Sequence, residues 1–270
     1  GIHGTFYSTA ADCHFDPPRG EGSTSRAWAG TVRPAVSPTS RYRVICPPRQ
    51  PRTRPLGQLL ETRLKRLSAP EMAGLVRGGQ RGVERECLRV TPDGQLARTP
   101  HPQTLGSALT NEYITTDYSE ALLEFVTPPQ LTNWETIQFL CDVHQFVMER
   151  IGDELLWPLS MPCSISGDAD VPLARYGSSN IGRMKTIYRL GLGHRYGRIM
   201  QAIAGIHYNY SLPDAFWPLY QALEGDGGDL QAFRSATYLG AVRNVRRFDW
   251  LLLYRVGAAP APCNSFVRGR

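Results

Sequence analysis

The stretch that decides the fold is Gly82-Val-Glu-Arg-Glu-Cys-Leu-Arg-Val90. Side chains alternate between the two faces of a strand, so this stretch predicts a strand that projects Glu84 and Glu86 side by side. Neighbouring like charges cost free energy unless water surrounds them or a cation lies between them. A solvated face balanced by Arg85 and Arg89 is the plain interpretation, and a cation site is the functional one.

A second acidic stretch repeats the pattern. If Glu120 to Val126 is a strand, Glu120 and Glu124 face one way within an otherwise apolar segment. A buried glutamate needs an ionic partner or a metal ion. Glu124 is therefore expected to be a buried functional acid, with a salt bridge to an arginine as the alternative.

A third strand is predicted over Ile206 to Leu212, where His207, Asn209 and Ser211 share one polar face. A lone histidine on a strand is more often structural than a ligand. Here its whole face is polar, which suits the wall of a site. Three strands would then offer inward oxygen and nitrogen groups to a cation site: Glu84 with Glu86, Glu124 with Asp117 and Glu120 nearby, and His207.

Carboxylate-rich sites suit Mg²⁺ or Mn²⁺, which such sites usually bind together with substrate phosphates. Gly177 and Gly182 have the spacing of a phosphate-binding loop, but Arg183 and Met184 stand where that loop needs Lys and Ser or Thr. A nucleotide would have to be held through metals and arginines. This favours ATP-dependent activation of a carboxylate.

Helical patterns surround these strands. One or two short helices are expected between Leu56 and Val76, and further helices between Asp214 and Tyr254. A capping box at Thr132-Asn-Trp-Glu135 predicts the start of another helix, with Gly152 as its end. The predicted packed stripe of that helix is Ile137, Leu140, His144, Val147 and Ile151, with His144 packed or partly exposed and not a ligand.

The chain has 270 residues and a net charge of +6, enough for one large domain or two small ones. Residues 1–55 hold eight arginines against three acidic residues, together with eight prolines and no apolar period. We expect this tail to be disordered and not native coding sequence. Nucleic-acid binding through the tail is the alternative, which the placement of its aromatic residues disfavours because they are not interleaved with the arginines.

The six cysteines include no Cys-x-x-Cys pair, so neither a zinc site nor a disulfide framework is indicated. No apolar run approaches the length of a membrane span. A cytoplasmic protein without membrane contact is expected.

Several long blocks resemble the proteobacterial glutamate-cysteine ligases, and together they run from about Leu56 to Arg270. Besides Gly82 to Val90, the blocks are His101 to Leu109, Ile114 to Phe125, Gly152 to Pro162, Tyr176 to Arg198 and Gly205 to Pro213. The resemblance does not cover residues 1–55. It stops before the family's full length, so we expect an N-terminal fragment of the catalytic domain over residues 56–270.

The resemblance implies an enzyme that joins the γ-carboxyl group of L-glutamate to the amine of L-cysteine with ATP, the first step of glutathione biosynthesis. It implies an α+β, glutamine-synthetase-like fold whose curved, mainly antiparallel sheet forms a cup with helices outside, here incomplete. A monomeric full-length protein is expected. A fragment without activity, or a noncatalytic module that binds metal or substrate, is the alternative.

The resemblance also implies roles for single residues. Glu84, Glu86 and Glu124 would be catalytic through Mg²⁺ or Mn²⁺, and Asp117 and His207 would complete the metal site. Four matched positions would line the cysteine pocket: Tyr118, Tyr188, Leu192 and Ile203.

Overall fold

The computed structural model describes residues 56–162, 164–257 and 264–267. Among these residues, those from Arg66 onward form one compact unit and residues 56–65 belong to another, so helix α1 (Leu56–Leu67) crosses that boundary. Residues 1–55 lie outside the described part, so their disorder and the domain boundary after them stay predictions. Within the described residues, no helix is both long and apolar enough to cross a membrane.

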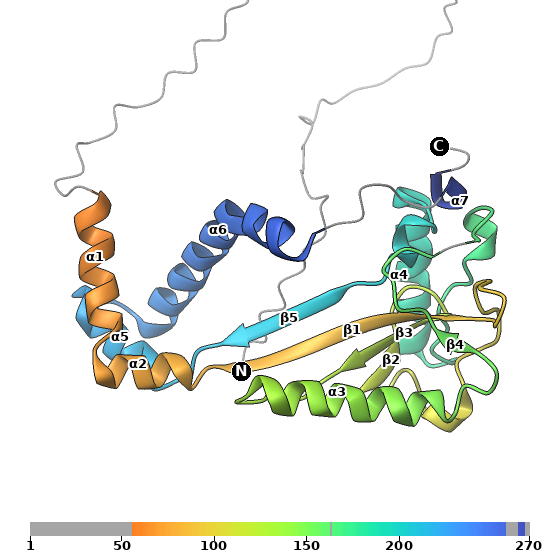
Figure 1. The fold of residues 1–270 in the computed structure, drawn as a ribbon, viewed down its shortest axis with the longest axis horizontal. Coiled ribbons are helices and arrows are strands. Elements are labelled where there is room, and N and C mark those ends of the chain that lie inside the picture. The colour runs from red at the N-terminus through yellow and green to blue at the C-terminus, as the bar shows by residue number, and fades with distance from the viewer. Residues whose placement is uncertain (1–55, 163, 258–263, 268–270) are drawn as a thin grey trace, which may run out of the picture. The chain divides into compact units, whose positions relative to one another are not determined.

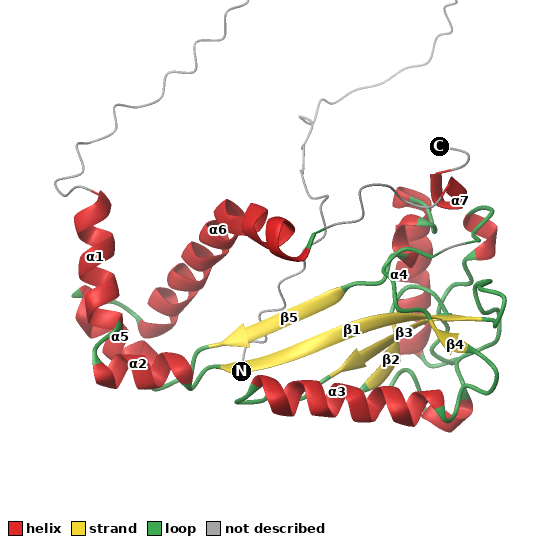
Figure 2. Ribbon diagram, in the orientation of Figure 1, coloured by secondary structure: helices red, strands yellow, loops and turns green. Residues whose placement is uncertain are grey.

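The unit from Arg66 onward combines α-helices with an antiparallel sheet, which confirms the predicted α+β class (Figures 1 and 2). Its further α-helices are α2 (Pro70–Arg77), α3 (Asn133–Met148), α4 (Asn180–Tyr196), α5 (Phe216–Glu224), α6 (Leu230–Val256) and α7 (Asn264–Val267). Its strands are β1 (Gln80–Val90), β2 (Ile114–Thr116), β3 (Leu122–Val126), β4 (Leu155–Leu156) and β5 (Ile206–Ser211). Short 3-10 turns lie at Gln103–Leu105, Asp168–Asp170 and Met200–Ala202.

Strand β1 is the centre of the sheet. It pairs with β3 from Glu84 to Leu88, and on its other side it pairs first with β5 and then with β4. β2 follows β3 at one edge, and all these pairings are antiparallel. Because β1 has partners on both sides around Glu84 and Arg85, the acidic part of the strand is held where the ladder is complete.

The two faces of the sheet carry different cores, as the alternation predicted. Leu88 and Leu122 pack with residues of the loops around α4, whereas Cys87, Leu123 and Phe125 pack against α3, which lies along that face (Figure 1). This alternation confirms that Glu84 and Glu86 share one face of β1, which is also the face of Leu88.

Helix α3 begins at the predicted capping box, in which Thr132 Oγ1 accepts from the Glu135 backbone N–H and Glu135 Oε2 accepts from the Thr132 backbone N–H at 3.1 Å. His144 is packed as predicted, with Nε2 3.8 Å from Cys87 Sγ and its ring edge-on to Phe125. His144 is therefore part of the core between α3 and the sheet.

Two details of the α3 prediction were wrong. The helix ends at Met148, not at Gly152, because the chain tightens into a turn in which the Arg150 N–H donates to the Val147 carbonyl. Ile137 does not belong to the packed stripe: its side chain is 54 % exposed, since the stripe begins one turn later.

The helices after β5 form a separate packed group. Phe216 and Trp217 of α5 bury their rings against Met72 of α2 and the first turns of α6. The end of α6 exposes a run of apolar side chains that includes Phe248, Trp250 and Tyr254. The helical content predicted for this part is confirmed, with α6 extending to Val256.

Candidate metal and substrate site

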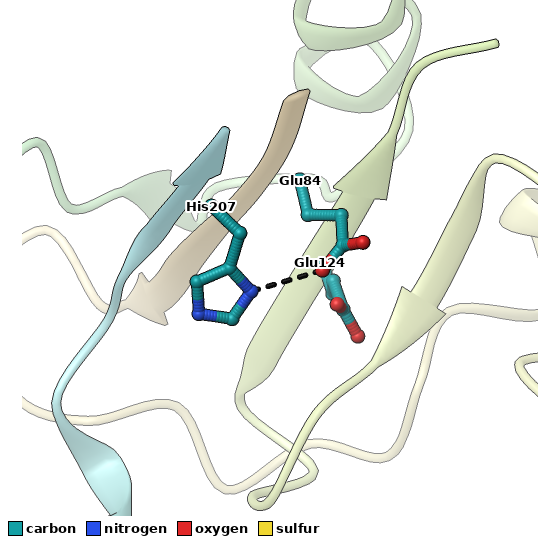
Figure 3. A group of neighbouring side chains, drawn as sticks. All are labelled: Glu84, Glu124 and His207. Carbon is teal, nitrogen blue, oxygen red and sulfur yellow. Dashed lines mark hydrogen bonds and ion pairs between the residues drawn. The ribbon is translucent and has the colours of Figure 1, made fainter. Parts of the chain in front are cut away.

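The pairing of three strands brings the predicted ligands together. Residues directly opposite each other on antiparallel strands point to the same face. In this register Glu86 lies opposite Glu124 of β3, and Glu84 lies opposite His207 of β5. Figure 3 shows Glu84, Glu124 and His207 turned toward one another.

The spacing of these three side chains fits one cation. One donor atom from each of Glu84, Glu124 and His207 lies within 4.8 Å of the others. His207 Nδ1 is 2.9 Å from Glu84 Oε2, and Asn209 Nδ2 donates to Glu84 Oε1 at 2.9 Å. Donors at metal distances of about 2.0–2.5 Å from a common centre are separated by such spacings. Two of the three donors are carboxylates, which suit Mg²⁺ or Mn²⁺.

Glu86 adds a third carboxylate, which is only 6 % exposed. Its Oε2 accepts from the Gly205 N–H at 2.6 Å, and its Oε1 lies 3.8 Å from His207 Nε2. A Cβ atom at position 205 would come within 3.2 Å of His207 Nε2, so glycine there lets the chain approach both side chains closely.

Asp117 joins the group from the turn between β2 and β3. Its carboxylate is close enough to raise the pKa of both Glu86 and Glu124. Burial raises the pKa of Asp117 itself, and the positive charge of Arg189 opposes that rise. The five predicted ligands are thus neighbours. Glu120 is not among them, because its carboxylate accepts the backbone N–H groups of His101 and Arg175.

The metal-free acids repel one another. Burial, followed by the charge of Asp117, raises the pKa of Glu86 and of Glu124 to about 7. Burial lowers the pKa of His207, but its hydrogen bond to Glu84 and the charges of Glu86, Glu84 and Glu124 outweigh this and raise it. A divalent cation would relieve this repulsion, which supports a cation site over a solvated strand face.

We expect the metal-free chain to lose stability as the pH rises through about 7. The folded chain keeps protons on Glu86 and Glu124 up to about 7, whereas the unfolded chain releases them near 4.5. Since the folded state binds more protons between these values, the free energy of unfolding falls as the pH rises, and the raised pKa of His207 acts in the same direction.

Thermal unfolding in the presence of a chelator, between about pH 5 and about pH 8, measures this effect. The double variant Glu86→Gln, Glu124→Gln is the control and should have a flatter profile. A melting temperature of the original chain that rises steadily over this range would contradict the prediction.

The predicted cysteine-pocket residues differ in burial. Tyr118 is buried in the core beside Leu88, and Leu192 and Ile203 pack against the same core. A Cβ atom at Gly193 of α4 would overlap the Tyr118 hydroxyl group, which has no hydrogen-bond partner among the described residues. Tyr188 lies one turn before Leu192 on α4, and it is 64 % exposed. An exposed tyrosine on a helix surface needs a further element to enclose it, and its role stays a prediction.

Sequence patterns missed several residues that support the site. Asn209 had been placed on the correct face but without a role, although its position two residues after His207 is a signal for contact with the same acid. Gly205, Tyr176 and Arg189 gave no local signal, because their contacts join segments that are distant in the chain.

Comparison with known proteins identifies a family. A family model described as glutamate-cysteine ligase matches residues 64–270. The chain is 59 % identical over 211 residues to the glutamate-cysteine ligase of Alcanivorax borkumensis, covering 78 % of this chain and 40 % of that protein. It is 53 % identical over 215 residues to the glutamate-cysteine ligase of Pseudomonas putida, covering 80 % and 41 %. The chain spans about two fifths of the length of these curated relatives.

Solved structures agree with this match. The crystal structure of glutamate-cysteine ligase from Francisella tularensis in complex with AMP has a TM-score of 0.66 at 41 % identity, over 71 % of this chain and 37 % of that chain. The bifunctional glutathione synthetase from Pasteurella multocida has a TM-score of 0.63 at 31 % identity, over 68 % of this chain and 24 % of that chain. The resemblance seen in the sequence blocks is confirmed.

Proposed function

This chain belongs to the glutamate-cysteine ligase family. We therefore propose that it supplies the cation-binding acids of an active site that joins L-glutamate to L-cysteine with ATP. The observation that carries the proposal is the convergence of Glu84, Glu124 and His207 from three strands, with Glu86 beside them. The AMP in the Francisella tularensis structure supports a nucleotide as the co-substrate.

Glu84, Glu86, Asp117, Glu124 and His207 would hold Mg²⁺ or Mn²⁺. Bound there, the cation would neutralise charge on the triphosphate of ATP and on the transferring phosphoryl group. Glu84 and Glu86 would hold the cation from the centre of the sheet, where ladder hydrogen bonds fix the backbone of β1. Rigid donors favour the geometry that such chemistry needs.

The proposed reaction has two steps. The γ-carboxylate of glutamate attacks the γ-phosphorus of ATP, and ADP leaves, which gives an acyl phosphate. The amine of cysteine then attacks the acyl carbon and loses a proton, and inorganic phosphate leaves. Four residues would line the cysteine pocket: Tyr118, Tyr188, Leu192 and Ile203. Three of them, Tyr118, Leu192 and Ile203, pack in one apolar cluster. We further propose a cytoplasmic enzyme that is monomeric when complete.

A noncatalytic module that binds metal or substrate is the second candidate, because the chain spans about two fifths of its relatives. On its own, it would then bind the cation without forming γ-glutamylcysteine. Nucleic-acid binding through residues 1–55 is a third candidate, and deletion of these residues should then abolish salt-dependent binding to DNA.

An exchange experiment tests the proposed function. In the Alcanivorax borkumensis ligase, residues 64–270 of this chain would replace the segment that they match. We expect the exchanged enzyme to form γ-glutamylcysteine from glutamate, cysteine and Mg·ATP, and its Glu124→Gln form to lose about 100-fold or more of this activity. A folded exchanged enzyme that releases no phosphate from ATP and makes no product would overturn the proposal. An assay of the purified 270-residue chain alone distinguishes the two candidates. Formation of γ-glutamylcysteine would indicate a complete active site, and cation binding without product would indicate a binding module.

A further inference from the structure

We infer that Tyr176 is a positioning residue of the acid cluster and that it acts by fixing the main chain that carries Asp117. This inference rests on the proposed function, because it assigns Tyr176 a role toward the same cation. It concerns a residue whose own side chain offers no ligand to the site.

The hydroxyl group of Tyr176 holds two consecutive peptide units. Tyr176 lies in the loop before α4 and is only 5 % exposed. Its Oη is 2.6 Å from the carbonyl oxygen of Thr116 and 2.9 Å from that of Asp117. The one hydroxyl hydrogen is shared between these two carbonyl oxygens, so a single side chain holds the backbone at the end of β2.

Helix α4 reinforces this contact. Arg189 donates from Nε to the Asp117 carbonyl oxygen, and its guanidinium carbon lies 4.7 Å from the centre of the Tyr176 ring. On the other side, the Asp117 N–H donates to the Leu122 carbonyl at 3.0 Å. Both backbone polar groups of Asp117 therefore make hydrogen bonds. Arg189 stacks on the Tyr176 ring, and both side chains donate to the Asp117 carbonyl oxygen.

Asp117 needs such support more than the other acids do. Glu84, Glu86 and Glu124 lie within strands, whereas Asp117 directly follows β2, a strand of three residues at the sheet edge. Cation ligands must be held within about 0.5 Å of their productive positions. Without the Tyr176 hydroxyl group, the peptide unit of Asp117 keeps only Arg189 as its side-chain support, and its carboxylate should point less precisely into the cluster.

The variant Tyr176→Phe tests the inference, because it keeps the ring and removes only the hydroxyl group. In Mn²⁺ titrations of the 270-residue chain followed by electron paramagnetic resonance, we expect about a 10-fold weaker affinity. Tyr238→Phe is the matched control, since it removes a hydroxyl group that accepts from the Leu212 N–H at 3.2 Å. The control should lower the melting temperature by a similar amount and leave the Mn²⁺ affinity unchanged.

A double-mutant cycle shows whether Tyr176 acts through Asp117. In an Asp117→Asn background, Tyr176→Phe should cause no further loss of Mn²⁺ affinity, because the group that it positions has already been replaced. An undiminished further loss in that background, or unchanged affinity in the single variant, would overturn the inference and leave the proposed function standing. If the original chain binds no Mn²⁺, the proposed cation site fails, and the inference fails with it.

Discussion

Glu124→Gln is expected to weaken Mn²⁺ binding about 100-fold or more while making the metal-free chain more stable at about pH 8. The glutamine has nearly the same shape but removes one negative charge from the three side chains that converge on one point. Glu124 is surrounded by Asp117, Glu86 and Glu84, whose charges raise its pKa after the larger effect of burial. Loss of the ligand therefore costs affinity, and loss of the repulsion adds stability.

The two readouts, Mn²⁺ affinity and melting temperature in chelator, separate a functional acid from a structural one. Glu120→Gln is the control, because Glu120 is a neighbouring glutamate that is buried where Glu124 is half-buried, and its carboxylate accepts two backbone N–H groups. Replacing it should lower the melting temperature and leave Mn²⁺ affinity unchanged, since charged hydrogen bonds are lost away from the cluster. If Glu124→Gln also lowered stability and kept full affinity, the acid cluster would be only structural.

Gly182→Ala is expected to destabilise the chain by about 2–3 kcal/mol or more. A Cβ atom at this position in the first turn of α4 would overlap the carbonyl oxygen of Tyr176, and it would lie 3.1 Å from that of Gly177. Both obstacles are backbone atoms, which cannot turn aside as a side chain can. The helix and the loop before it must move apart, and the Tyr176 ring moves with the loop. Reduced Mn²⁺ affinity should accompany the loss of stability.

Gly191→Ala in the same helix provides the comparison. No atom lies within 4 Å of a Cβ atom built at Gly191, and the residue is exposed. Alanine there should stabilise the helix by roughly 0.5–1 kcal/mol, because glycine loses more backbone freedom on folding. Urea unfolding of both variants measures the difference. Equal stabilities of the two variants would contradict the prediction, because they would show that the loop before α4 accommodates the added methyl group without loss of stability.

The local patterns of the sequence predicted the elements of this fold well, because their signals lie within a few residues. Alternation identified β1, and the capping box identified the start of α3. The packed stripe of α3 was predicted one turn too far toward the N-terminus. Helical spacing puts Ile137 on the correct face, but whether it is buried depends on tertiary contacts, which the spacing does not predict.

The sequence predicted the candidate cation ligands better than the residues that hold those ligands in place. Glu84, Glu86 and His207 were identifiable because charged groups interrupt strands that otherwise alternate. Their contacts with Gly205 and Asn209, and the hold of Tyr176 on Asp117, follow from strand pairing and loop packing across long stretches of chain. Asp117 and Glu120 were both candidates because they lie near Glu124 in the sequence, and only the blocks shared with the ligase family favoured Asp117.

Because side chains of β1 alternate between two different faces, the strand should tolerate insertions and deletions poorly. Cys87 faces α3, whereas Glu86 and Leu88 face the opposite side. Deleting a single codon between Glu84 and Leu88 would shift the rest of the strand by one residue and send every later side chain to the wrong face. Apolar side chains would then meet the acids, and charged ones would enter the core. A point substitution away from Glu84 and Glu86 changes one side chain, whereas a change in length moves all the later ones, so insertions and deletions should be confined to the turns at the ends of the strand.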